Sequence, residues 1–248
     1  MKRFLTLVAV VLACVSLAPA QGPQAKSPKE FDAVMAIQSA ANPNARVAAA
    51  KSLLTGFKNT EFKEFANFML MVSYQQLDDF ENMMVYGERT LEINPENPGV
   101  LVQLAYAIPS RTRQFDLDKE EKLTKAEDLA SRALALIPNL DKLNPDMSDE
   151  EWLDTKKDFM AQANESLGVI EAKRTNYDEA AAFLTRAIEL QPLPSSMTHY
   201  HLADSYMNAG KKAEALGAVN QSITLGGVPL GGGGDAAKNL KQQIEAMN

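Results

Sequence analysis

Residues 164–192 read NESLGVIEAKRTNYDEAAAFLTRAIELQP. Small and large residues hold separate positions in this stretch, and a proline closes it: small at Gly168, Ala180 and Ala187, large at Leu167, Tyr177, Leu184 and Ile188, with Pro192 last. Apolar residues spaced by three and four positions are typical of amphipathic helices, and proline ends a helix. The stretch therefore predicts helices, and its order of small and large residues is a pattern to seek elsewhere in the chain.

The same order recurs on both sides of this stretch. Three further units carry it: Leu70, Met71, Tyr74, Phe80, Met83, Leu91 and Pro95; then Leu104, Ala105, Ala126, Ala130, Ala133, Leu134 and Pro138; and, downstream, Leu202, Ala203, Tyr206, Gly210, Ala215, Val219 and Ile223. Leu104 follows Leu70 by 34 residues. A fixed period of this size is the signature of repeated helical units that stack on a shared core.

The recurring pattern resembles the tetratricopeptide (TPR) repeat. Met71, Met83 and Thr90 stand where that family prefers small residues, which is a departure from its pattern. The resemblance implies two antiparallel helices per unit, which meet where the small residues let the backbones approach. It also implies an all-α, right-handed α-solenoid of about four helix pairs over residues 29–248.

Composition agrees with a helical protein. The chain has 248 residues, of which 46% are hydrophobic and 23% charged, enough for a continuous core. Apolar residues recur at helical spacing, as in Leu129, Ala130, Ala133, Leu134 and Ile137. Because no long alternating β-branched stretch occurs, we expect almost no strand.

Residues 1–20 have the features of a secretory signal peptide. Lys2 and Arg3 precede an apolar run, and Ala18-Pro19-Ala20 has the small-x-small form of a cleavage site. We expect cleavage after Ala20 and a periplasmic or secreted protein. Two alternatives stay open: an uncleaved anchor, and a lipoprotein signal in which Val11-Leu12-Ala13-Cys14 is the lipobox and Cys14 is lipidated.

Cys14 is the only cysteine, so cleavage after Ala20 leaves none for disulfides, thiol catalysis or metal binding. The formal net charge is −7, and removal of Lys2 and Arg3 leaves 23 basic against 32 acidic residues, a net charge of −9. Nucleic acids and anionic lipids attract basic surfaces, so we expect neither as a partner.

Both ends of the repeat array have segments that predict caps. Residues 21–28 predict a disordered leader. Glu30–Ala41 and Ala45–Phe57 predict a helical hairpin that covers the N-terminal end of the array. Ala236–Met247 predicts a closing helix with Asp235 as its cap. The glycine cluster 231–234 is interpreted as a linker; a phosphate loop is the disfavoured alternative, because no Lys-Ser/Thr pair follows and Asp235 would repel an anion.

Two insertions interrupt the repeats. Between Ile108 and Lys125, the turn that joins the two helices of the second repeat is longer than is usual in the family. This extra length predicts either a functional loop around Arg111–Lys122 or an extended second helix that starts near Asp118. After Pro138 comes a loop, then Ser148-x-x-Glu151, the form of a capping box. Trp152 follows in an unusually long helix. We expect it to pack against the preceding repeat; an exposed anchor for a partner is the alternative.

Signatures of catalysis and of metal binding are missing from the sequence. His199 and His201 would point about 200° apart on a helix, so they cannot share a metal. Neither a nucleophile setting nor a P-loop, dinucleotide or zinc-hydrolase motif occurs. The acidic runs at Asp78-Asp79 and 149–151 are expected at turns or helix starts. We expect no enzyme activity, no cofactor and no metal site.

The resemblance implies a binding groove lined by the first helix of each repeat. The matching positions are Phe68, Val72, Gln75, Gln76, Val102, Tyr106, Glu165, Val169, Lys173, Tyr200, Asp204 and Met207. Tyr106 and Tyr200 are the expected anchors, since tyrosine gives a large contact area at low entropy cost. The function expected is an exported scaffold that binds another protein. A lipid-anchored envelope assembly factor is the alternative, and an exported enzyme a remote one.

Overall fold

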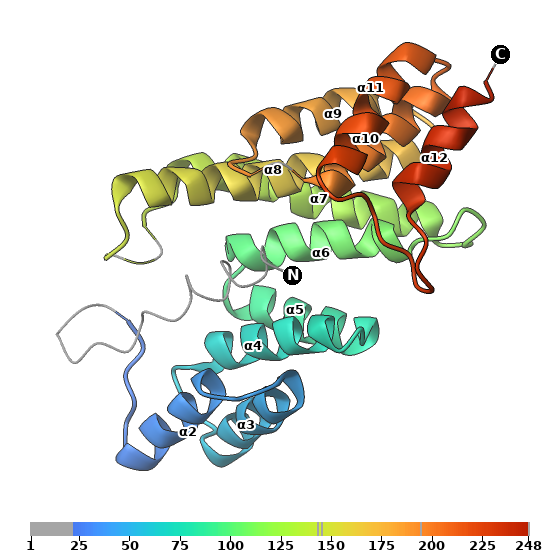
Figure 1. Ribbon diagram of the computed structural model, residues 1–248. Coiled ribbons are helices and arrows are strands. Elements are labelled where there is room, and N and C mark those ends of the chain that lie inside the picture. Colours follow the sequence, from blue (N-terminus) through green and yellow to red (C-terminus); the bar gives the residue numbers. More distant parts are fainter. Residues whose placement is uncertain (1–21, 143, 145, 194, 248) are drawn as a thin grey trace. The chain divides into compact units, whose positions relative to one another are not determined.

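The computed structural model describes residues 22–142, 144, 146–193 and 195–247, and these residues are mostly helical (Figure 1). Their only β-type pairing is an isolated antiparallel bridge between Pro229 and Asp235. The all-α prediction is therefore confirmed for the described part of the chain. The expected signal peptide, the cleavage site after Ala20 and Cys14 lie outside the described residues.

The chain divides into two compact units. The first contains the described residues up to Val100 together with 140–147, and the second contains Leu101–Asn139 and the residues from Ser148 onward. The boundary falls inside helix α6 (Pro98–Arg111). The repeat array that the sequence predicts as one domain over 29–248 thus contains residues of two compact units.

The first unit begins with a helical hairpin. Helices α2 (Pro28–Gln38) and α3 (Pro43–Gly56) pack together, and α3 packs on α4 (Lys63–Gln76), which packs on α5 (Phe80–Ile93). Both hairpin helices begin two residues before the predicted starts. The reason is local: Ser27 and Asn42 each accept a backbone N–H bond, and the proline that follows each is suited to the first helical position.

The leader before α2 makes polar contacts. The N–H of Gln24 donates to Glu61 at 3.2 Å, and Lys26 Nζ donates to the carbonyl of Asn59 at 3.0 Å. Lys26 also lies 3.3 Å from the Glu61 carboxylate. Residues 22–27 have no helix or strand. These contacts tie the leader to the turn before α4, and its disorder stays a prediction.

The second unit contains α7 (Lys119–Leu136), the 3-10 turn η1 (Ile137–Asn139), α8 (Asp149–Lys173), α9 (Tyr177–Leu190), α10 (Ser196–Asn208), α11 (Lys212–Thr224) and α12 (Ala236–Glu245). Along the chain, α7 packs on α8, α8 on α9, α9 on α10, α10 on α11 and α11 on α12 (Figure 1). The predicted repeat pairs correspond to α4–α5, α6–α7, α8–α9 and α10–α11.

The small residues of the 164–192 stretch lie where α8 and α9 touch. A Cβ on Gly168 would lie 2.5 Å from Cγ of Leu184 and 3.1 Å from the carbonyl oxygen of Ala180. Ala180, Leu184 and Ala187 are themselves fully buried. The approach of the two backbones therefore depends on the absence of a side chain at residue 168.

The first insertion is mostly helix. Helix α6 continues through Pro109 to Arg111, and α7 starts at Lys119, so the connecting loop is residues 112–118. The structure thus has the extended second helix that was one of the two alternatives. The end of α6 is held by Thr112, whose hydroxyl donates to the carbonyl of Ile108 at 2.8 Å. Lys173 Nζ in turn donates to the carbonyl of Thr112 at 2.9 Å.

The capping box at the start of α8 is confirmed. Ser148 Oγ accepts the N–H of Glu151 at 3.2 Å, and the Glu151 carboxylate accepts the N–H of Ser148 at 2.9 Å. Trp152 is buried, which agrees with a packing role and leaves no exposed anchor. Lys156 lies 5.3 Å from the centre of its ring and donates to the carbonyl of Pro138 at 3.0 Å. The extra turns of α8 are therefore joined to η1.

Replacing Ser148 with alanine is expected to cost about 1 kcal/mol of unfolding free energy, because the backbone N–H of Glu151 loses its acceptor. The bonds from Ser148 lower the pKa of Glu151. This carboxylate's contribution is therefore present above its ordinary pKa and is lost as pH falls through the lowered value. Urea unfolding at neutral and acidic pH measures both effects. Ser148→Thr is the control, and an equal loss in the two variants would contradict the capping role.

The C-terminal helix closes the second unit as predicted. Ala237, Leu240 and Ile244 of α12 are buried, and Asp235 caps the helix by accepting the N–H of Ala237 at 2.9 Å. The same carboxylate accepts the N–H of Val228 at 3.0 Å. It therefore fixes the preceding glycine-rich loop as well.

Candidate functional site

The expected groove residues differ in accessibility. Phe68, Val72, Val102, Glu165 and Val169 are each 7% exposed or less. A partner cannot reach these five side chains without a change in packing. The remaining candidates are partly or fully exposed: Gln75, Gln76, Tyr106, Lys173, Tyr200, Asp204 and Met207.

In the first unit, the exposed candidate Gln76 is already held by a neighbour. Arg46 of α3 donates to its side-chain oxygen at 3.0 Å. Val72 and Phe68, one and two turns earlier on α4, are buried. The first unit therefore offers little accessible surface at the positions that the resemblance implied.

In the second unit, side chains of α6, α8 and α10 interact in two groups, Tyr106 with Glu165, and Asp204 with Tyr200 and Lys173. These five residues are called here the inner-face cluster. Burial and the Glu165 carboxylate raise the pKa of Tyr106. Burial and the Asp204 carboxylate raise the pKa of Tyr200. The pKa of Asp204 is raised by burial, against a hydrogen bond from Asn208 and the charge of Lys173. Tyr106 thus lies near Glu165, and Tyr200 lies near Asp204.

The histidines of α10 are not arranged as metal ligands. Burial, with the nearby charge of Lys173, lowers the pKa of His201 to about 4, so its ring is neutral at pH 7. Burial also lowers the pKa of His199. Within the part of the chain that the structure describes, no three His, Cys, Asp or Glu side chains gather to hold a metal ion.

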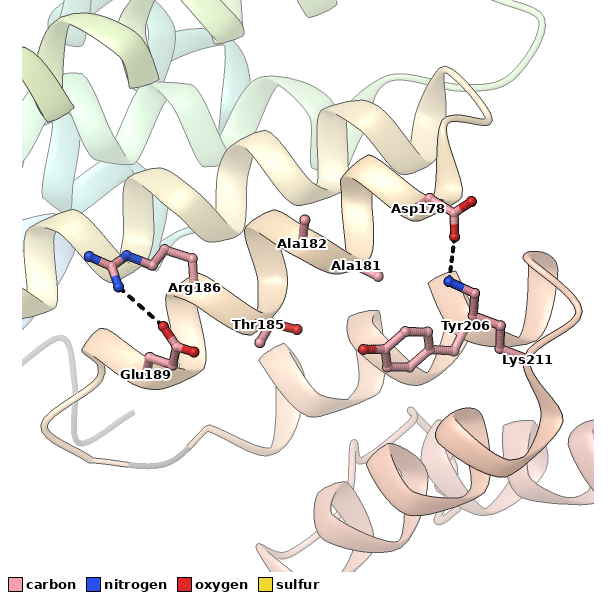
Figure 2. A pocket seen from close by; sticks show the side chains of 8 residues that line it. All are labelled: Asp178, Ala181, Ala182, Thr185, Arg186, Glu189, Tyr206 and Lys211. Atoms are coloured by element: carbon pink, nitrogen blue, oxygen red, sulfur yellow. Dashed lines mark hydrogen bonds and ion pairs between the residues drawn. The ribbon is translucent and has the colours of Figure 1, made fainter.

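A second candidate is an open pocket of about 410 Å³ on the α9 side of this unit (Figure 2). It is lined by Asp178, Ala181, Ala182, Thr185, Arg186, Glu189, Tyr206 and Lys211. Figure 2 shows the Tyr206 ring extending toward the small side chains of α9. The pocket is thus apolar in the middle and charged at both ends.

One ion pair lies at each end of this pocket. Lys211 Nζ lies 2.7 Å from Asp178, and Arg186 lies 3.1 Å from Glu189. Sequence reasoning missed the pocket because it lies on a second helix, whereas the resemblance implied first helices only. The available signal was the row of small residues Ala181, Ala182 and Thr185, which leaves space beside a neighbouring aromatic ring.

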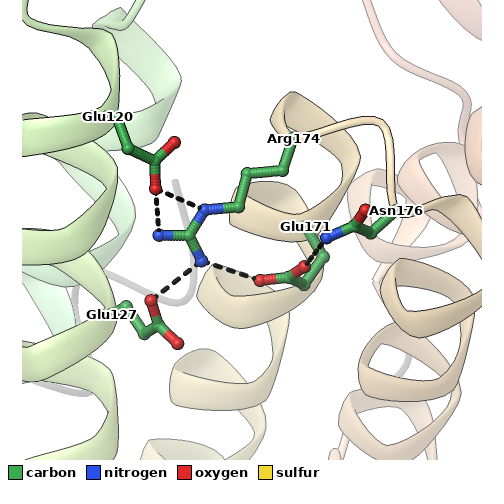
Figure 3. Close-up of polar contacts among 5 residues, drawn as sticks. All are labelled: Glu120, Glu127, Glu171, Arg174 and Asn176. Atoms are coloured by element: carbon green, nitrogen blue, oxygen red, sulfur yellow. Dashed lines mark hydrogen bonds and ion pairs between the residues drawn. The ribbon is translucent and has the colours of Figure 1, made fainter.

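Arg174 is a further residue that the sequence did not single out (Figure 3). Its guanidinium lies 2.7 Å from Glu120, 2.8 Å from Glu127 and 2.9 Å from Glu171. Glu171 also accepts a bond from Asn176 at 2.6 Å. Burial opposes the charge, but the three carboxylates raise the pKa of Arg174 overall. The network joins α7, α8 and the turn before α9, which is a structural role.

Solved structures of other proteins have a fold similar to that of this chain. No family model matches the chain, and no curated protein matches it in sequence. Among solved structures, a thermophilic TPR protein from Thermus thermophilus is 17% identical, with coverage of 88% of this chain and 98% of that one and a TM-score of 0.54.

Two other solved structures are also similar to this chain. PilW, a widely conserved type IV pilus biogenesis factor, is 17% identical, with coverage of 88% and 85% and a TM-score of 0.61. MamA from Desulfovibrio magneticus is 14% identical, with coverage of 81% and 97% and a TM-score of 0.59. At these identities the likeness concerns the fold alone. The chain has the tetratricopeptide-repeat fold.

Proposed function

We propose that this protein is an exported, non-enzymatic scaffold that binds another protein through the inner face of its second unit. The observation that carries the proposal is the position of Tyr200, Asp204 and Met207. All three lie on α10, and all three are only partly buried. Their spacing of four and three residues places them along one side of the helix, where an extended peptide or a helix can lie against them.

The chemistry of this face supports binding rather than catalysis. The His201 ring, with a pKa of about 4, is a poor general base near neutral pH, and Lys173 is engaged by the carbonyl of Thr112. Tyrosine and methionine are, in contrast, enriched at protein interfaces.

Export is the second part of the proposal, and the features of residues 1–20 support it. The lipid-anchored envelope assembly factor, with Cys14 as the lipidated residue, remains the alternative. Mass spectrometry of the mature N-terminus distinguishes them: Gln21 as first residue agrees with cleavage after Ala20, and a lipidated Cys14 with the anchor. None of the described helices has the length and apolar character that a membrane crossing requires.

Replacing Tyr200 with alanine is expected to weaken partner binding by about 1–2 kcal/mol, because a large amphipathic contact is lost. Helicity is expected to stay unchanged, since Tyr200 is only half-buried. The measurement is a titration of a partner, isolated by affinity capture from the protein's own envelope extract, against wild type and variant.

Two variants serve as controls for this titration. Tyr206→Ala removes the same side chain from another side of α10 and is expected to bind the partner normally. Tyr106→Phe retains the ring of the more deeply buried tyrosine, so it tests the hydroxyl alone. Normal binding by Tyr200→Ala, together with lost binding by Tyr206→Ala, would move the site from the inner face to the pocket.

A further inference from the structure

Asp204 on α10 is a partly buried carboxylate that forms no ion pair with any residue that the structure describes. Its side chain accepts a hydrogen bond from Asn208, and the charge of Lys173 acts on it from beyond the distance of an ion pair. The Lys173 ammonium donates instead to the carbonyl of Thr112 at 2.9 Å. The Asp204 carboxylate is therefore left without a cation in direct contact.

Two other carboxylates of the second unit have such a cation although they are far more exposed. Asp178 lies 2.7 Å from Lys211, and Glu189 lies 3.1 Å from Arg186. Their side chains are 69% and 59% exposed, so water already solvates their charge. Burial removes such water, which means that Asp204 would gain more from a cation than either of them.

The charge of Asp204 also opposes the stability of the folded chain. Burial raises the pKa of this carboxyl, and the hydrogen bond from Asn208 and the charge of Lys173 offset that effect only in part. A raised pKa means that the ionised form is less favourable in the folded protein than in water. Residues with such a local cost are concentrated at sites where a ligand completes their interactions.

The neighbours of Asp204 on α10 are suited to a basic side chain. Tyr200 lies one turn before it and Met207 one turn after it, on the same side of the helix. The Tyr200 ring contacts the edge of the His201 ring, with centroids 5.6 Å apart, and His201 is neutral at pH 7 because its pKa is about 4. An aromatic ring attracts a cation, and a thioether packs on the methylene groups that carry it.

We propose that the partner of the inner face presents an arginine between apolar residues, and that this arginine pairs with Asp204 and lies against Tyr200 and Met207. The inference rests on the proposed function, since it names the chemistry of the segment that binds there. Arginine fits better than lysine because its planar guanidinium can bond a carboxylate and stack on an aromatic ring at the same time.

An acidic segment is the disfavoured occupant of this face. Asp204 would repel it, and the chain as a whole has a net charge of −7. Lys173, the cation that could attract it, is already bonded to the carbonyl of Thr112. Charge complementarity thus favours a basic partner segment.

Three peptides test the proposal on the purified full chain. They are the acetylated and amidated nonapeptide Gly-Ser-Leu-Ala-Arg-Ala-Leu-Ser-Gly and the same peptide with a central glutamine or glutamate. Nuclear magnetic resonance titration of the ¹⁵N-labelled protein is the measurement. The arginine peptide is expected to shift the amide signals of residues 200–207, with a dissociation constant about fivefold or more below that of the glutamine peptide. The glutamate peptide is expected to bind more weakly still.

Variants of Asp204 identify the group that recognises the arginine. Asp204→Asn is expected to raise the dissociation constant of the arginine peptide about tenfold, whereas Asp204→Glu, which retains the charge, is expected to stay within about threefold of wild type. Asp32→Asn is the matched control: it removes the same charge from an exposed position of α2 and is expected to bind as wild type does.

The stability of Asp204→Asn separates a lost contact from a lost fold. Because the ionised carboxylate opposes folding, this variant is expected to unfold at the same urea concentration as wild type or at a higher one. The isolated partner of the inner-face titration is then measured against the same variants. Asp204→Asn is expected to weaken its binding about tenfold at low salt and by a smaller factor at high salt.

Several results would overturn the proposal. They are equal binding of the arginine and glutamine peptides, no binding of any peptide, normal binding by Asp204→Asn, and an equal loss in Asp32→Asn, which would indicate a general attraction by the acidic chain. Partner binding that is weakened by Tyr200→Ala but kept by Asp204→Asn would reject the arginine and leave the proposed function standing. Partner binding that both variants keep would count against both.

Discussion

Replacing Gly168 with leucine is expected to lower the free energy of unfolding of the second unit by about 2–4 kcal/mol. Even the first atom of a side chain would lie 2.5 Å from Cγ of Leu184, which is fully buried. The carbonyl oxygen of Ala180, at 3.1 Å, belongs to the backbone and can shift even less than the Leu184 side chain. Helices α8 and α9 would have to separate, which opens space in a close-packed core.

The matched control is Gly217, a glycine inside helix α11. A Cβ there meets no atom within 4 Å, so Gly217→Ala is expected to raise stability by about 0.5–1 kcal/mol through the helix propensity alone. Urea unfolding followed by the helical circular dichroism signal measures both variants. Equal midpoints for wild type and Gly168→Leu would show that α8 and α9 do not meet at this position.

The second large effect is expected at Arg174. Its replacement by alanine is expected to cost about 2–3 kcal/mol, because three charge-assisted contacts are lost and the carboxylates of Glu120, Glu127 and Glu171 are left facing one another. The Arg174 and Glu171 side chains are only 17% and 13% exposed, so water replaces these contacts poorly. Glu120 and Glu127 are more exposed, so water weakens their contacts with Arg174. The expected loss of stability is therefore smaller than for a fully buried ion pair.

Arg186 provides the comparison for this prediction. Its pair with Glu189 is also three residues apart on a helix, but both side chains are 59% exposed. Arg186→Ala is expected to change stability by no more than about 0.5 kcal/mol. Thermal unfolding at low and high salt is the measurement, and the Arg174→Ala penalty is expected to shrink as salt increases. Similar midpoints for the two variants would contradict a stabilising role for the Arg174 network.

The elements that sequence reasoning found depend on contacts between near neighbours. The Ser148 cap reaches only to Glu151, and the Asp235 cap only to Ala237. Helix periodicity likewise connects residues three and four positions apart. Interactions of this range are visible in a sequence, and these two caps and the helical class were therefore predictable.

The groove itself stays a prediction. A position on a first helix follows from the repeat register, and Tyr106 lies on α6 and Tyr200 on α10. Burial does not follow from register, since it depends on which distant residues cover a side chain. Phe68 and Val102 proved to be buried, whereas Tyr200 is partly open.

By itself, the sequence determined the helical class and the caps, because residues a few positions apart specify each of them. It also determined the repeat pairs, because one pattern of small and large residues recurs along the chain. Only the tertiary structure decided the Arg174 network, whose partner Glu120 is 54 residues distant in the chain. It also decided the pocket between α9 and Tyr206 and the exposure of Phe115. Their physical origin is the packing of separate helices, which brings together or leaves uncovered side chains that no local pattern relates.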